Sequence, residues 1–130
     1  MRRILPALTM LALVTAGCGG GSTKKPPVAL SGRTNNHGTK AAKDDLEVEL
    51  DGFYFAPTFI TAKSGQKFSV SLKNDGDTRH TFSSPTLGID IELAPGDSRT
   101  VTVDAPEGGF TEFHCRFHQS QGMQGAVYVG

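Results

Sequence analysis

A cysteine, a histidine and a methionine lie within nine residues near the end of this 130-residue chain. The segment CRFHQSQGM, from Cys115 to Met123, separates two stretches whose alternating apolar residues are typical of β-strands, so it should form one short loop. Another histidine, His80, stands 35 residues before Cys115 at the start of a further predicted strand, directly after a turn. A thiolate, two imidazoles (His80 and His118) and a thioether can therefore converge on one point.

These side chains are the ligand types of a blue-copper centre, in which soft sulfur donors select copper and a trigonal geometry suits both of its oxidation states. Zinc binds cysteine and histidine but normally takes no thioether. Attachment of a haem would need a second cysteine two residues away, followed by histidine. A binuclear copper centre would need two cysteines on the loop, which has one. The sequence therefore favours a site for a single copper ion.

Each of the four residues also has a purely structural interpretation when it is taken alone. Cys115 could be a buried thiol and Met123 a core side chain, while His80 could end a strand and His118 could lie on a surface loop. All other cysteines and methionines of the chain lie within its first 18 residues. The metal site is therefore favoured over four separate structural roles. Under the structural interpretation, the remaining thiol and the remaining thioether would stand at ligand spacing by chance alone.

The elements that must position these residues are short β-strands. From Leu46 onward, apolar and polar residues alternate with a period of two, and turn signals such as Asp51-Gly52 and Pro95-Gly96 separate the stretches. This pattern predicts an all-β sandwich or small barrel of about eight strands with almost no helix. The predicted strands are Leu46–Asp51, Pro57–Ala62, Lys67–Lys73, His80–Ser83, Ile89–Leu93, Thr100–Val103, Phe110–Cys115 and Ala126–Val129.

Strand alternation also separates the histidines that could bind metal from those that should not. Along Phe110–Cys115, the side chains of Phe113 and Cys115 share one face, and His114 lies on the other. We expect His114 to face solvent and not to act as a fifth ligand. His37 stands among Thr, Asn and Gly without a second ligand type at useful spacing, and we interpret it as a solvated loop residue.

The motif Cys115-x-x-His118-x-x-x-x-Met123 is followed by Gly125 and a valine-rich last strand, and His80 precedes it in the sequence HTF. Together these features resemble the cupredoxin family, and the loop spacing is that of plastocyanin and pseudoazurin. The resemblance covers the whole predicted sandwich.

The resemblance implies a Greek-key β-sandwich over residues 46–130 with the copper ion at one end. It implies that His80, Cys115 and His118 are the equatorial ligands and that Met123 is the axial ligand. Single electrons would be exchanged through the exposed edge of His118.

Two positions beside the site depart from the plastocyanin pattern. Thr81 stands where Asn commonly follows the upstream histidine, and Phe117 stands where Pro commonly precedes the loop histidine. Neither change removes a ligand, but both affect hydrogen bonding to the thiolate. We expect the amide of Thr81 to donate to the sulfur, and Phe117, which has the N–H that proline lacks, could supply a second donor.

The first 45 residues predict an exported and anchored protein. Met1–Gly17 has a charged start, a short apolar stretch and a small-residue site, which is the layout of a secretory signal peptide. The position of Cys18 directly after it resembles the bacterial lipobox and implies lipidation of that cysteine. An ordinary signal peptide and a Cys18–Cys115 disulfide are the alternatives. Residues 18–45, rich in Gly, Ser, Pro and Lys, are interpreted as a flexible tether.

The distribution of charged residues excludes nucleic-acid binding as a function of the predicted sandwich. Residues 46–130 carry six basic and eleven acidic side chains, so they offer no basic surface for nucleic acid. A complete ligand set without an open coordination position predicts an electron carrier and not an enzyme. We expect a monomer that exchanges electrons with a redox protein donor and acceptor, and the export signal places it outside the cytoplasm. The N-terminal lipid would tie it to the cell-envelope membrane. The alternative is a module that buffers copper or hands it over. Additional Met and His clusters would favour this alternative, and the sequence does not show them.

Overall fold

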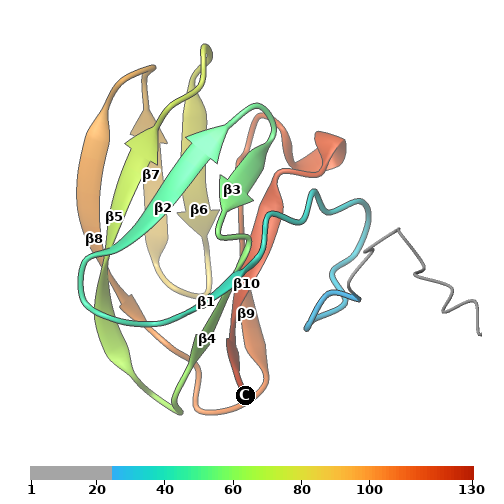
Figure 1. Cartoon of the computed structure of the whole chain (residues 1–130), viewed down its shortest axis with the longest axis vertical. Coiled ribbons are helices and arrows are strands. Elements are labelled where there is room, and N and C mark those ends of the chain that lie inside the picture. Colours follow the sequence, from blue (N-terminus) through green and yellow to red (C-terminus); the bar gives the residue numbers. More distant parts are fainter. Residues whose placement is uncertain (1–24) are drawn as a thin grey trace, which may run out of the picture.

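The computed structural model describes residues 25–130, which form a sandwich of two β-sheets (Figure 1). In the six-stranded sheet the order is β1 (Thr39–Ala41), β4 (Phe59–Ala62), β10 (Gln124–Val129), β9 (Phe110–His114), β6 (His80–Ser84) and β7 (Ile89–Leu93). In the four-stranded sheet it is β3 (Tyr54–Ala56), β2 (Leu46–Asp51), β5 (Lys67–Asn74) and β8 (Ser98–Asp104). A single 3₁₀ turn, η1 (Gln119–Gln121), is the helical element of the described part. The predicted all-β sandwich is confirmed.

Each of the eight predicted strands is present, with ends that differ by a few residues. The structure adds two strands of three residues each, β1 and β3. β3 returns antiparallel along β2, and β1 lies parallel to β4. These additions are too short to show an alternating pattern in the sequence. No helix in the described range is long and apolar enough to cross a membrane.

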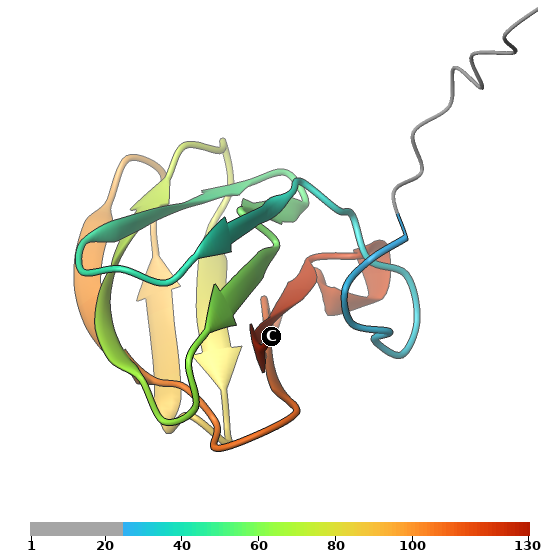
Figure 2. The same ribbon diagram turned by 60° about the horizontal axis from the view of Figure 1, so that its bottom comes forward.

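The core lies between the facing sheets, which Figure 2 shows from a second direction. Along β2 the apolar residues of the alternating pattern are buried, and the residues between them are more exposed. The rings of Phe55, Phe82 and Phe113 pack at the centre, with centroids 4.7–5.8 Å apart. Cys115 and Met123 belong to the same buried cluster. Two of the four candidate metal ligands are therefore part of the hydrophobic core.

Sheet topology brings the chemistry-bearing residues to one end of the sandwich. β6 and β9 are antiparallel neighbours, with Ser83 opposite His114. Because the strands run in opposite directions, β6 begins where β9 ends, so His80 lies at the same end as Cys115. β9 also pairs antiparallel with β10. The loop between these two strands, which carries His118, must lie at that end too (Figure 1).

The described part of the N-terminal segment differs from the expected flexible tether. β1 pairs with β4, and Ala42 N donates to Thr61 O over 2.8 Å. Val28 is buried in a small cluster with Phe59 and Ala126. The physical reason is that the free edge of β4 offers backbone hydrogen-bond partners. A segment can pair with such an edge even when its sequence has no apolar periodicity. Residues 25–45 therefore belong to the folded domain, whereas the predicted signal peptide and Cys18 lie outside the described residues.

Candidate metal centre

Three side chains meet in a triangle of potential metal ligands. His80 Nδ1 and His118 Nδ1 are 3.2 Å apart, and Cys115 Sγ lies 3.5 Å from His118 Nδ1 and 3.9 Å from His80 Nδ1. An ion at the centre of such a triangle, bonded to nitrogen at about 2.0 Å and to sulfur at about 2.3 Å, would hold these atoms about 3.5–3.7 Å apart. The spacing of the three side chains therefore fits one bound ion.

The lowered pKa values of the two imidazoles are also consistent with a site for a cation. Burial lowers the pKa of His80, and a charge on His118 lowers it further, while Asp51 acts in the opposite direction. Burial lowers the pKa of His118 as well. Both rings are therefore held towards the neutral form, which is the form that binds metal. Two imidazoles held towards the neutral form and a buried thiol, whose ligand atoms lie within 4.8 Å of one another, form a donor set suited to copper.

Backbone hydrogen bonds fix the loop that carries His118 and Met123. Cys115 N donates to Met123 O over 3.1 Å, and Met123 N donates to His118 O over 3.2 Å. The 3₁₀ turn between them ends at Gly122, whose φ of +98° requires a left-handed conformation that favours glycine. Met123 is fully buried beside Cys115 in the core cluster. The structure therefore brings His80, Cys115 and His118 together and buries Met123 next to Cys115 in the chain fold, whereas binding of the ion by Met123 stays a prediction.

Among the described residues the thiol has one amide donor, which comes from the expected position. Thr81 N donates to Cys115 Sγ over 3.4 Å. The Thr81 hydroxyl accepts from Arg116 N over 2.8 Å, so the residue after the cysteine is tied to the same threonine. Thr81 thus connects β6 to the start of the loop and orients the sulfur.

The expected second donor, Phe117, does not reach the sulfur in this structure. The turn is closed instead by His118 N donating to Cys115 O over 3.3 Å, so the carbonyl and not the sulfur receives a loop amide. The Phe117 ring is 48% exposed, and the Arg116 guanidinium lies 5.4 Å from its centroid. Phe117 therefore contributes a surface beside His118, where the two ring centroids are 6.3 Å apart, and not a hydrogen bond to the thiolate.

The other two histidines of the chain are not part of the triangle. His114 is half-buried on the face of β9 opposite Phe113, in agreement with the predicted alternation. The ring of His37 is exposed and stacks on Tyr54, with centroids 3.5 Å apart and an interplanar angle of 13°. His37 is therefore better described as a stacked surface residue than as a freely solvated one.

Two neighbours of the site were not foreseen, because they lie where a predicted strand ends in a turn and no role was assigned to them. The Phe53 ring lies over His118, with centroids 4.3 Å apart. Asp51 lies near His80: a Cβ on Gly76 would come within 3.1 Å of both Asp51 Oδ1 and His80 Nε2. That ring nitrogen is buried and has no hydrogen-bond partner among residues 25–130. An acidic residue directly before a glycine turn is common, so the sequence held no specific signal for this contact.

The proximity of Asp51 to His80 gives a first testable prediction. Asp51→Asn removes a negative charge that favours Cu(II) over Cu(I), so the reduction potential of the copper-loaded protein should rise. We expect an increase of about 50 mV, the equivalent of roughly 1.2 kcal/mol for a one-electron couple. Voltammetry should be compared with Asp104→Asn, which removes the same charge from an exposed pair with Lys67. Equal potentials in the two variants would contradict the prediction.

Comparisons with known proteins agree with this geometry. A family model described as a cupredoxin-like domain matches residues 23–129. The reduced auracyanin of Roseiflexus castenholzii is 21% identical, with a TM-score of 0.55 over 68% of this chain and 98% of that chain. Auracyanin B is 17% identical, with a TM-score of 0.57 over 75% and 96% of the two chains.

A third structure extends this likeness beyond the auracyanins. The metal-binding domain of a Cu(I)-exporting P-type ATPase from Streptococcus pneumoniae is 13% identical, with a TM-score of 0.59 over 74% of this chain and 99% of that domain. At these identities the structural matches establish the shared fold alone. A comparison with curated proteins found no match.

The family match and the local geometry lead to the same conclusion. The match spans nearly the whole described range, and it begins before β1, in agreement with the folded N-terminal segment. The histidine–cysteine–histidine triangle, with Met123 buried beside it, fits a single type 1 copper ion. This chain therefore belongs to the cupredoxin-like domain family.

Proposed function

We propose that this protein carries single electrons between redox partners outside the cytoplasm. The observation that supports this function is the unequal exposure of the ligand set. His80, Cys115 and Met123 are fully buried, and only His118 is partly exposed. A site of this kind can exchange electrons through one ligand edge while water is kept from the others. The copper ion, when bound, supplies a couple that gains one electron from a donor and loses it to an acceptor.

The residues around the ion would keep its geometry unchanged between the two oxidation states. His80 belongs to β6 and Cys115 directly follows β9, so strand pairing holds them. The amide of Thr81 directs a positive dipole at the sulfur, which draws electron density from the thiolate and favours the reduced state. Phe53 and Phe117 flank the His118 ring and leave its edge as the route to a partner.

Repeated redox cycling in the presence of a copper chelator tests this function. The copper-loaded protein should be reduced and reoxidised over many cycles by small one-electron reagents while a Cu(I) chelator is present in excess. An electron carrier is expected to retain its copper and its visible spectrum throughout. If the chelator removes copper faster than electrons are exchanged, the protein is a copper-delivery module and the proposed function is wrong.

The axial ligand provides a second prediction. Met123→Leu should leave a coloured copper site, because the thiolate remains, but it should raise the reduction potential, because a weak donor to Cu(II) is lost. The shift should be about 60 mV for each 1.4 kcal/mol of stabilisation lost by the Cu(II) form. Spectroscopy and voltammetry of the same sample measure both properties. An unchanged potential would show that Met123 does not bind the ion.

We also propose that a lipid on Cys18 holds the protein at the outer face of a membrane. The support is the signal-like sequence before Cys18, as described above. Cys18→Ser should release the protein from the membrane fraction into the soluble fraction of the host cell. Retention of the variant after a high-salt wash would contradict lipid anchoring. Metabolic labelling with a fatty acid analogue provides the direct check.

A further inference from the structure

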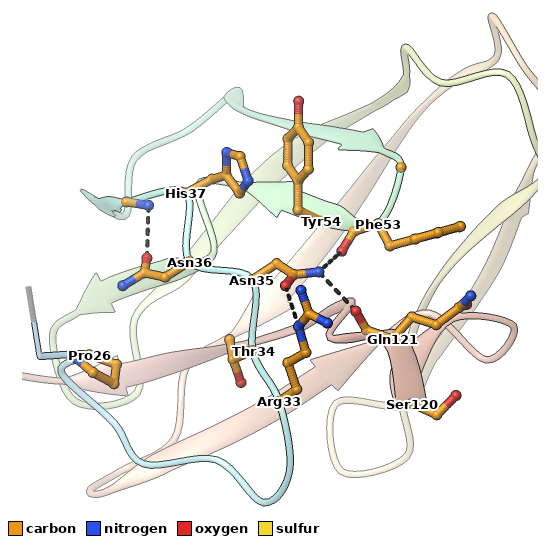
Figure 3. Close-up of a pocket in the computed structure, with 12 residues that line it drawn as sticks. Pro26, Arg33, Thr34, Asn35, Asn36, His37, Phe53, Tyr54, Ser120 and Gln121 are labelled. Carbon is orange, nitrogen blue, oxygen red and sulfur yellow. Dashed lines mark hydrogen bonds between the residues drawn. The ribbon is translucent and has the colours of Figure 1, made fainter. Parts of the chain in front are cut away.

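We propose that Asn35 is a positioning residue for the copper site, through which the N-terminal segment fixes the ligand loop; this inference rests on the proposed copper function. We call residues 31–38 the strap. It runs beside η1 and the turn between β2 and β3 in both views of the fold (Figures 1 and 2). Figure 3 shows the pocket that these three segments line, with Asn35 between Phe53 and Gln121.

The side chain of Asn35 joins two segments that are far apart in the sequence. Its Nδ2 donates to Phe53 O over 2.8 Å and to Gln121 O over 2.9 Å. Its Oδ1 accepts from Arg33 Nε over 3.1 Å, which is consistent with the orientation of the amide group. Both N–H groups of the amide are therefore used to connect the β2–β3 turn to the ligand loop.

The backbone of the strap adds to this connection. Asn35 N donates to Gly122 O over 2.9 Å, and a Cβ on Gly122 would approach the Asn35 side chain to 2.8 Å. Gln124 Nε2 lies within 3.0 Å of Ser31 O, Arg33 O and Thr34 Oγ1. The strap is thus bonded on both sides of Met123, so the position of this ligand depends on a segment outside the loop.

The second segment that Asn35 holds carries the ring that covers His118. Phe53 O accepts from Asn35, and the Phe53 ring packs on the His118 imidazole. Loss of the Asn35 amide would therefore free both the loop that carries two ligands and the ring that covers one of them. The expected consequence is a looser copper geometry without loss of the core, which these bonds do not enter.

Hydrogen exchange of the copper-free protein tests the positioning role directly. Asn35→Ala and Asn35→Asp both remove the two amide donors, and the aspartate keeps the side-chain shape. We expect the amides of Gly122 and Met123 to exchange at least about fivefold faster in both variants, while core amides of β5 stay unchanged. Asn36→Ala is the matched control, because within the described part of the chain the Asn36 side chain accepts a hydrogen bond from Gly38 N of the strap and makes no other.

The copper-loaded variants provide the second measurement. Asn35→Ala and Asn35→Asp should release Cu(I) to a chelator about fivefold faster than Asn36→Ala and should shift the visible band. The inference is overturned if both Asn35 variants match the control, or if all amides exchange faster to the same extent, which would indicate general destabilisation. The exchange experiment requires no electron transfer, so it can fail or succeed independently of the proposed function.

Discussion

Cys115→Ser is expected to abolish the intense visible absorption of the Cu(II)-loaded protein. That absorption arises from charge transfer between the thiolate and copper, and Cys115 is the one thiol of residues 25–130. A serine hydroxyl is a hard and weakly acidic donor, which binds copper poorly between two imidazoles. We expect loss of essentially all of the band and at least about tenfold weaker copper binding.

The fold of this variant should survive, which makes the result interpretable. Cys115 is fully buried, and serine is close to it in size, although its hydroxyl must accept the bond from Thr81 N. Circular dichroism of the copper-free variant should therefore match that of the original protein. A coloured Cys115→Ser protein would show that the metal is bound elsewhere.

The fold was largely predictable because it depends on local patterns. Alternation of apolar residues marked most of the strands, and β2 is an example in which each expected inward residue is buried. It did not mark β6, all five residues of which are buried. The pairing of strands was not predictable in the same way. Nothing in the sequence of β1 indicates its parallel contact with β4, because edge pairing uses backbone groups and not side chains.

The site was predictable as far as its ligands are concerned, because few residue types bind copper and their spacing is short. The contacts around the ligands were not, since they come from segments distant in the sequence. Phe53 reaches His118 from the β2–β3 turn, and Asn35 reaches the loop from the strap. The amide of Phe117 was expected at the sulfur from spacing alone, but the direction of an N–H depends on how the turn closes, which spacing does not determine.

Gly125→Ala is expected to cause the largest loss of stability. Gly125 lies on β10 opposite Phe113 of β9. A Cβ at this position would lie 2.0 Å from Thr58 O and 2.6 Å from two atoms of the Phe113 ring, closer than real contacts allow. Thr58 and Phe113 are fully buried, and Thr58 O also accepts from Ala126 N, so neither can move aside freely. We expect a loss of about 3–5 kcal/mol in the free energy of unfolding.

A second glycine separates this steric cost from the general effect of replacing glycine. Gly108 lies between β8 and β9, and a Cβ there would meet no atom of residues 25–130 within 4 Å. Gly108→Ala should therefore change the melting temperature little, whereas Gly125→Ala should lower it by roughly 15–30 °C. Equal melting temperatures would show that β10 lies further from Thr58 than the structure places it. Because Gly125 follows Met123 by two residues and Phe113 precedes Cys115 by two, the same backbone shift should also weaken copper binding.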